Sequence, residues 1–182
     1  MLKILSPLFF QNKNTVKIAK NLIGKFLVRE YKEKIKAYMI TEVEAYCGME
    51  DKASHAHKGK TERNTPMFNS AGRWYVYLIY GMYYMLNIVT GPQNYPAAIL
   101  IRCISIASLE HSRMTAINGP GKLTKKLKIN KVLNNKKAVP KNDLWIEDRG
   151  VKINKKDIKK SARIGVDYAG PVWSKKKLRF FL

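Results

Sequence analysis

The fold of this chain is decided by YMITEVEAY (residues 38–46) together with WYVYLIYGMYYMLNIVTGPQNYPAAILI (residues 74–101). The first stretch alternates as a strand does, which places Glu42, Glu44 and Tyr46 on one face. The second stretch contains no charged residue and is followed directly by Arg102. We therefore expect an apolar, tyrosine-rich sheet with carboxylates on one strand and an arginine on another. Such a surface is suited to a flat aromatic ligand.

The uncharged stretch is long enough to raise the possibility of a transmembrane segment. It is interrupted by Gly81, Asn87, Pro92 and Pro96, however, so strands joined by turns are the better interpretation. The predicted strands are residues 74–79, 83–90 and 97–106, with a turn at 91–94. We expect a protein without a membrane span.

The flanking segments predict an ordinary mixture of helix and strand. Asn14 begins a short amphipathic helix that ends before Gly24, and a strand begins at residues 26–28. We expect a polar hairpin connection at 30–36 and a long irregular loop at 47–73, a length that is usually functional or disordered. A glycine-proline loop at 118–121 precedes a helix that opens at Lys122. Backbone amides there suit a phosphate or an ordinary helix start equally well.

The bulk composition predicts one domain spanning 1–182 and a polyanionic partner. The chain has 182 residues, 46% of them hydrophobic, and a formal net charge of +22 from 35 Lys+Arg and 13 Asp+Glu. Same-sign repulsion of this size lowers stability, so a merely solubilising lysine coat is the weaker explanation. Nucleic acid is the first candidate partner and an anionic membrane surface the second.

The cysteines and the N-terminus carry little function. Cys47 and Cys103 are far apart and in no metal-type spacing, and Cys103 lies in an apolar strand where an inert thiol is expected. We predict no disulfide, no metal and no cofactor. Residues 1–7 are broken by Pro7 too early for a signal peptide, so we expect a cytoplasmic protein.

The two carboxylates of residues 38–46 have a structural and a catalytic interpretation. Like charges on one strand face are unfavourable unless one is paired or exposed, and a single buried carboxylate is more often structural than catalytic. The other functional side chains expected near this sheet are His55, Tyr77, Asn87 and Arg102. Their presence beside the carboxylates favours the catalytic interpretation. Tyr80, beside Gly81 at a turn, could pack or wedge between bases.

Several motifs, in order and at compatible spacing, resemble the alkyladenine (3-methyladenine, methylpurine) DNA glycosylase family. The resemblance covers most of the chain, and the run at 75–83 is its most specific part. Residues 107–117 look shorter than in the family, and its members commonly continue beyond the equivalent of Leu182. The motifs are TEVEAY (41–46), EDKASH (50–55), TERN (61–64), MF (67–68), YVYLIYGMY (75–83), LNI (86–88), LIR (100–102), NGPGKL (118–123) and ARIGV (162–166).

The resemblance implies a role for each candidate site residue. Glu44 matches the general base that activates water, and Arg102 matches the arginine near that carboxylate. The flipped base would be contacted by Tyr46, His55 and Tyr77. Asn87 matches the residue that excludes guanine, Tyr80 the one that fills the gap in the DNA, and the main chain near Ile164 a position close to the water.

The resemblance also implies the fold and the reaction. We expect a single α+β domain with a curved, mainly antiparallel β-sheet and peripheral helices. The expected activity is monofunctional excision of alkylated purines from duplex DNA by a monomer associated with the bacterial nucleoid. Two rivals stay open, namely a non-catalytic basic nucleic-acid-binding module and a hydrolase of free nucleotides.

Overall fold

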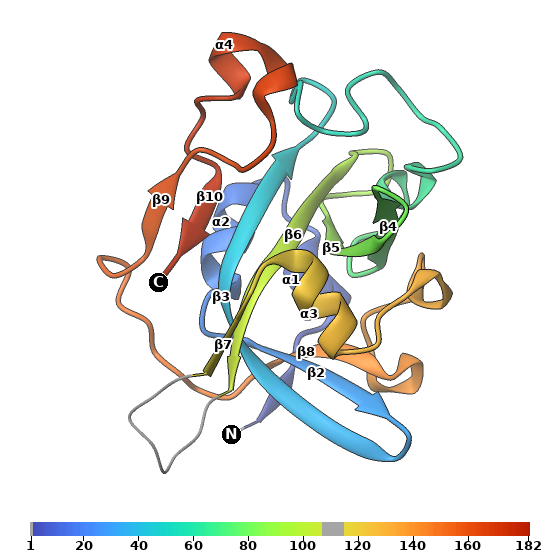
Figure 1. Cartoon of the computed structure of the whole chain (residues 1–182), viewed down its shortest axis with the longest axis vertical. Coiled ribbons are helices and arrows are strands. Elements are labelled where there is room, and N and C mark those ends of the chain that lie inside the picture. Colours follow the sequence, from blue (N-terminus) through green and yellow to red (C-terminus); the bar gives the residue numbers. More distant parts are fainter. Residues whose placement is uncertain (1, 107–114) are drawn as a thin grey trace.

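A computed structural model describes residues 2–106 and 115–182, and its main feature is one sheet of ten strands (Figure 1). Every pairing between these strands is antiparallel. The strands are β1 (Lys3–Ile4), β2 (Phe26–Tyr31), β3 (Lys34–Cys47), β4 (Trp74–Ile79), β5 (Tyr83–Thr90), β6 (Ala97–Ile106), β7 (Thr115–Asn118), β8 (Leu144–Asp148), β9 (Lys159–Ser161) and β10 (Arg179–Phe181).

The long strands β3 and β6 pair with each other at the centre of the sheet, within the order β1-β8-β2-β3-β6-β5-β4. On the side away from β6, β3 pairs first with β2 and then with β10. In the same way, β6 pairs with β5 through its first half and with β7 through its second. Because each central strand changes partner along its length, the sheet forks and curves around the core.

Short helices surround this sheet, which confirms the α+β class and the antiparallel, curved architecture expected from the resemblance (Figure 1). Among the described residues, no helix has both the length and the apolar character needed to cross a membrane. The helices are α1 (Pro7–Phe10), α2 (Thr15–Leu22), α3 (Pro120–Lys126) and α4 (Gly170–Trp173), and the 3₁₀ turns are η1 (Thr65–Phe68), η2 (Lys131–Leu133), η3 (Pro140–Asn142) and η4 (Asp167–Ala169).

The first long helix forms for the predicted reason. The Asn14 side chain accepts a hydrogen bond from the Lys17 amide at 2.9 Å, which satisfies one of the free donors of the first turn. Ile18, Ala19 and Leu22 are buried on one side of α2. This apolar side packs on β3 and β6 and closes the core at one end.

The core lies on one face of the sheet, where alternate residues of β3 to β6 point inward. Val43 and Ala45 of β3 and Ile99 and Ile101 of β6 are fully buried there. The opposite face of β4, β5 and β6 carries a smaller apolar cluster under η1, which includes Tyr75 and Met67. The chemistry described below lies on this second face.

Two predicted boundaries were wrong. The polar segment 30–36 is a hairpin whose strands continue to Tyr31 and resume at Lys34, so that only Lys32 and Glu33 make the turn. Both turn residues have positive φ, 50° and 61°, which matches the twist of a tight hairpin. Helix α3 begins at Pro120 and not at Lys122, because proline is well suited to a first helical position. Of the segment that looked short, residues 107–114 lie outside the described residues.

Candidate active site

One row of paired residues crosses five strands and builds the site. Tyr75 pairs with Asn87, Asn87 with Leu100, Leu100 with Glu44, and Glu44 with Arg179. Directly paired residues of antiparallel strands point to the same face. The register therefore brings Glu44, Asn87 and Tyr75 to one surface although they are far apart in the sequence. Tyr46 and Tyr77 join them, because each lies two residues further along its strand.

A pair of register shifts between β3 and β6 explains how Arg102 reaches both glutamates. The pairing steps from Ile40↔Ile104 to Glu42↔Cys103, and then to Val43↔Ile101, so that Arg102 is left without a direct partner. Such bulges re-aim side chains. Here both Arg102 and Cys103 contact Glu42, Arg102 Nε at 2.8 Å from Oε1 and Cys103 Sγ at 2.9 Å from Oε2.

Glu44 is fully buried and is held by three donors. The Tyr46 hydroxyl donates to Oε2 at 3.0 Å, the Ile164 amide donates to Oε1 at 2.9 Å, and Arg102 Nη1 lies 3.4 Å from Oε1. Burial raises the pKa of Glu44 above its ordinary value, while Arg102, the Ile164 amide and Tyr46 oppose that rise. A carboxylate in this balance can be ionised and still basic.

Tyr46 serves Glu44 as a donor. Burial, with the charge of Glu44 as the next cause, raises the pKa of Tyr46 well above its usual value. The phenol therefore stays protonated and keeps its hydrogen bond to the carboxylate. The guanidinium carbon of Arg163 lies 4.7 Å from the centre of the Tyr46 ring, and this cation–π contact helps to hold the ring in place.

Glu42 is the structural member of the carboxylate pair. It binds Arg102 at 2.8 Å, and Arg179 Nη1 lies 3.4 Å from the same oxygen. Arg179 Nε in turn donates to the Ser161 hydroxyl at 2.7 Å. The strain of two like charges on one face is thus relieved by two arginines, which leaves Glu44 free for another role.

Aromatic side chains line the cavity next to Glu44. The Tyr75 and Tyr77 ring centres are 5.0 Å apart, and His55 meets Tyr77 edge to face at 4.6 Å. His55 Nδ1 also shares a hydrogen bond of 2.9 Å with the Tyr75 hydroxyl. Burial, and then the charge of Arg63, lowers the pKa of His55, so its ring is neutral at pH 7. A cationic aromatic ligand would therefore meet the π-faces of the tyrosines and a histidine ring that adds no positive charge.

Asn87 closes one side of this cavity in a fixed orientation. Its Nδ2 donates to the carbonyls of Tyr75 at 3.1 Å and Met85 at 3.4 Å, and the residue is buried. The cavity has a volume of about 30 Å³ and is lined by Tyr46, Ser54, His55, Met67, Tyr75, Tyr77, Asn87, Ala98 and Tyr168.

A buried ion pair that sequence reasoning did not single out fixes the 47–73 loop against the C-terminal part of the chain. Arg163 grips Asp51 with two nitrogens, at 2.5 and 2.8 Å, and also donates to the Ala45 carbonyl at 2.9 Å. Asp51 in turn accepts the amides of Cys47 and Ala53. Burial alone would lower the pKa of Arg163, but Asp51 more than offsets it and the pKa rises. Because 112 residues separate the partners, local spacing gave no indication of this pair.

The structure brings six of the seven predicted site residues together and places the seventh apart. Glu44, Arg102, Tyr46, His55, Tyr77 and Asn87 surround or adjoin the cavity. Tyr80 lies instead at the β4–β5 turn with 82% of its surface exposed. Sequence reasoning missed Tyr168, which lines the cavity and whose hydroxyl donates to the Ala53 carbonyl at 3.0 Å.

Within the described part of the chain, no group of three or more His, Cys, Asp and Glu side chains is arranged to hold a metal ion. The two thiols are held in protonated form, since burial raises the pKa of Cys47 to about 11 and that of Cys103 to about 12.

Comparison with known proteins identifies the family. Residues 9–182 match the family described as methylpurine-DNA glycosylase (MPG). The relatives include a Methanocella arvoryzae protein that is 42% identical over 90% of this chain and 86% of its own length. A Legionella pneumophila (strain Paris) protein is 41% identical over 100% and 95%. A Clostridioides difficile protein is 39% identical over 88% and 92%. All three carry the name "Putative 3-methyladenine DNA glycosylase".

The class that follows from this match is that of hydrolases acting on N-glycosyl bonds, with DNA as the substrate. Within that class, the chain belongs to the methylpurine-DNA glycosylase family.

Proposed function

We propose that this protein is a monofunctional glycosylase that flips alkylated purines out of duplex DNA and hydrolyses their N-glycosidic bond. The expected bases are 3-methyladenine and 7-methylguanine, with hypoxanthine and ethenoadenine as further candidates, and the product is an abasic site. The observation that carries the proposal is the buried Glu44 carboxylate, hydrogen-bonded at both oxygens beside an aromatic cavity.

Glu44 is the proposed general base. It takes a proton from water as the water oxygen attacks C1′ of the sugar, while the bond from C1′ to the purine nitrogen breaks. The electron pair of that bond leaves with the base. The sugar passes through an oxocarbenium-like state, which a carboxylate in a water-poor site stabilises strongly. The Ile164 amide and Arg102 hold one oxygen of Glu44 in place and keep the carboxylate charged.

Tyr46, His55 and Tyr77 are proposed to hold the flipped base. Flipping costs a few kcal/mol and is cheapest for a damaged, poorly paired base. Alkylated purines such as 3-methyladenine are cationic and therefore stack favourably on tyrosine faces. The neutral His55 adds no repulsion.

Two further roles complete the proposal. The fixed Asn87 side chain would crowd the exocyclic amine of guanine and exclude the normal base. Tyr80, exposed at the β4–β5 turn, would occupy the gap in the base stack. None of the residues that line the cavity is lysine, so no Schiff base is expected and the enzyme should lack lyase activity.

Family membership favours this enzyme over the two rivals, a non-catalytic binding module and a hydrolase of free nucleotides. A binding module has no need for Glu44, Arg102 and Asn87 on one surface. We expect the protein to act as a monomer in the cytoplasm, where its positive charge would keep it on the nucleoid.

Glu44→Gln tests the proposal. The amide cannot accept the water proton, so base release from methylated duplex DNA should fall about 100- to 10,000-fold while DNA binding is retained. The measurement is free 3-methyladenine under single-turnover conditions, with abasic sites revealed by strand cleavage only after alkali. Glu147→Gln is the matched control, because Glu147 is another buried strand glutamate and is bound by Trp145 and Arg149 away from the cavity. Near-normal excision by Glu44→Gln would remove Glu44 as the base.

A further inference from the structure

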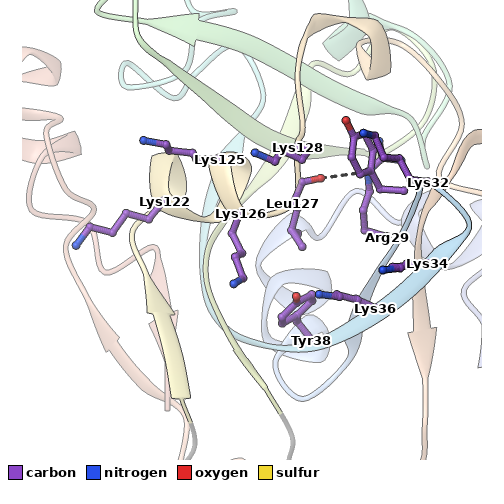
Figure 2. Close-up of a pocket in the computed structure, with 11 residues that line it drawn as sticks. Arg29, Lys32, Lys34, Lys36, Tyr38, Lys122, Lys125, Lys126, Leu127 and Lys128 are labelled. Atoms are coloured by element: carbon purple, nitrogen blue, oxygen red, sulfur yellow. Dashed lines mark hydrogen bonds between the residues drawn. The ribbon is translucent and has the colours of Figure 1, made fainter.

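A groove lined by cations lies between α3 and the β2–β3 hairpin, outside the candidate active site (Figure 2). Its volume is about 670 Å³, far larger than that of the aromatic cavity. Lys32, Lys34 and Lys36 line one wall, and Lys122, Lys125 and Lys126 of α3 line the other. No carboxylate is among the lining residues.

The spacing of these lysines makes each wall a row of charge. Lys34 and Lys36 are alternate residues of β3, so they project from the same face about 7 Å apart. Lys122, Lys125 and Lys126 are spaced i, i+3 and i+4 on α3, which places them on one side of the helix. Two facing rows of cations suit a polymer of repeating negative charge better than a single small anion.

The groove is held open by its own framework. Arg29, which is buried at its base, donates through Nε to the Leu127 carbonyl at 3.2 Å and through Nη1 to the Asp143 carbonyl at 2.8 Å. This side chain fastens the hairpin to the end of α3, as the dashed bond in Figure 2 shows. The backbones of the two walls are therefore tied together at the base of the groove.

The charges in the groove are uncompensated. Among the residues that the structure describes, none of the groove lysines forms an ion pair. The lysines of both walls are exposed. Gathering unpaired cations around one hollow costs stability, which a polyanionic ligand would recover.

The groove continues toward the proposed point of entry into DNA. A second hollow of about 560 Å³ shares Tyr31, Lys125 and Lys128 with it and extends to Met82 and Tyr83. Met82 follows Tyr80 and Gly81 in the β4–β5 turn, and Tyr83 is the first residue of β5. A path thus leads along α3 from the hairpin lysines, past Lys125 and Lys128, to the turn with the tyrosine that would replace the flipped nucleotide.

We propose that this path, the hairpin–α3 groove, binds the phosphate backbone of DNA flanking the damaged nucleotide, on one side of it only. The proposal rests on the proposed function, because the insertion of Tyr80 at the damaged nucleotide determines where the DNA lies relative to the groove. It enlarges the DNA footprint beyond the flipped base and predicts an asymmetric one, since the groove leads away from the turn in one direction.

The test compares two duplexes of equal length that carry the same lesion near one end or near the other. The variant Lys32→Ala/Lys34→Ala/Lys36→Ala removes one wall of the groove. The matched control, Lys152→Ala/Lys155→Ala/Lys159→Ala, removes the same charge from an exposed segment that lines a different groove. Dissociation constants are measured over a series of salt concentrations.

In one of the two duplexes, the longer arm beside the lesion extends along the groove; we call this the groove-filling duplex. Wild type and control should bind the groove-filling duplex more tightly than the second duplex. The hairpin variant should bind both duplexes with equal affinity. If all three lysines contact phosphates, the slope of log K against log salt should fall by about 2.7 for the groove-filling duplex only. Equal behaviour of the two triple variants, or an equal loss on both duplexes, would overturn the groove as a one-sided DNA site.

Base release separates this inference from the proposed function. At saturating enzyme, the hairpin variant should release the base at the wild-type rate, because its substitutions lie outside the cavity. Normal release with no duplex asymmetry would reject the groove alone. Absence of release by the wild type would reject the proposed function, whatever the binding data show.

Discussion

At the scale of single residues, the central question is what keeps Glu44 basic and charged at once. Burial favours its protonated form, and Arg102 is the largest of the influences that oppose burial. Arg102 is itself held by Glu42 at 2.8 Å, with Arg179 on the same oxygen. The basicity of one carboxylate therefore depends on a second carboxylate that has no contact with the cavity.

Arg102→Gln should move the acidic limb of the pH–rate profile to higher pH. As the proposed base, Glu44 must be ionised. Burial raises its pKa, and loss of Arg102 removes a charge that lowers it. At a given low pH, fewer molecules would then carry the carboxylate, so the rate would fall most there. Single-turnover base release measured from acidic to neutral pH checks this.

Arg179→Gln is the control for that experiment, because the Arg179 side chain contacts Glu42 at 3.4 Å, whereas the Glu44 oxygens are held by Arg102, Tyr46 and the Ile164 amide. Its profile should stay close to that of the wild type. An unchanged acidic limb in Arg102→Gln would mean that the arginine does not tune Glu44.

At the scale of elements, the β4–β5 turn presents Tyr80 at an energetic cost. Tyr80 has φ 51° and Gly81 has φ 66°, and the turn is closed by the Met82 amide donating to the Ile79 carbonyl at 3.1 Å. A bulky residue in the left-handed region is strained, typically by about 1–2 kcal/mol. Packing does not repay this strain, since the side chain is mostly exposed.

Tyr80→Asn should therefore separate function from stability. Asparagine tolerates positive φ, so the free energy of unfolding should stay equal or rise by up to about 1 kcal/mol. Binding to lesion-containing duplex should weaken more than binding to undamaged duplex. Denaturant unfolding and paired binding curves measure the two effects. A loss of stability above about 1 kcal/mol would show that Tyr80 is a packing residue.

The elements also show which parts of the structure a sequence can predict. Alternation and helical spacing predicted the strands at 74–79, 83–90 and 97–106 and helix α2, because burial of one face leaves a periodic pattern. A hairpin connection was predicted at 30–36, but not that its strands extend to Tyr31 and resume at Lys34, because these strand ends are polar and depend on pairing with each other. The register shifts that turn Arg102 toward Glu42 also left no local pattern.

The site divides in the same way. Glu42, Glu44 and Tyr46 were expected on one face from strand alternation alone, and the structure confirms it. The roles given to His55, Tyr77, Asn87 and Tyr80 came from the family resemblance and stay predictions. Asp51, Arg163 and Tyr168 were assigned no role, since their contacts join segments that only tertiary structure brings together.

At the scale of the whole molecule, the net charge of +22 affects stability and binding in opposite directions. Salt screens repulsion among the cations of the free protein and also competes with their contacts to phosphates. More than half of the 35 basic residues lie between Lys122 and Leu182, so the effect is strongest for that part of the chain.

Raising the salt concentration from about 50 to 200 mM should raise the Tm of the free protein and weaken its binding to DNA. Each kcal/mol of repulsion that is screened should raise Tm by about 2–4 °C, and DNA affinity should fall about 1,000-fold or more if six or more phosphates are contacted. Sucrose is the control, because it stabilises the fold without screening charge. A Tm that falls with salt would mean that the cations are already compensated within the fold.

The pairing of β10 with β3 has a consequence for biosynthesis. The Ile164 amide that binds Glu44 is made 120 residues after it, and Arg179 pairs with Glu44 later still. At about 5–20 residues per second, translation of that interval takes roughly 6 to 24 s. During this time the chain already contains the basic β2–β3 hairpin, but the Glu44 carboxylate lacks the Ile164 amide that donates to it, and β3 lacks its partner β10. For the proposed reaction, the cations that would bind DNA are therefore synthesised before the base has all of its donors, so a chain still in synthesis should bind DNA before it can release a purine.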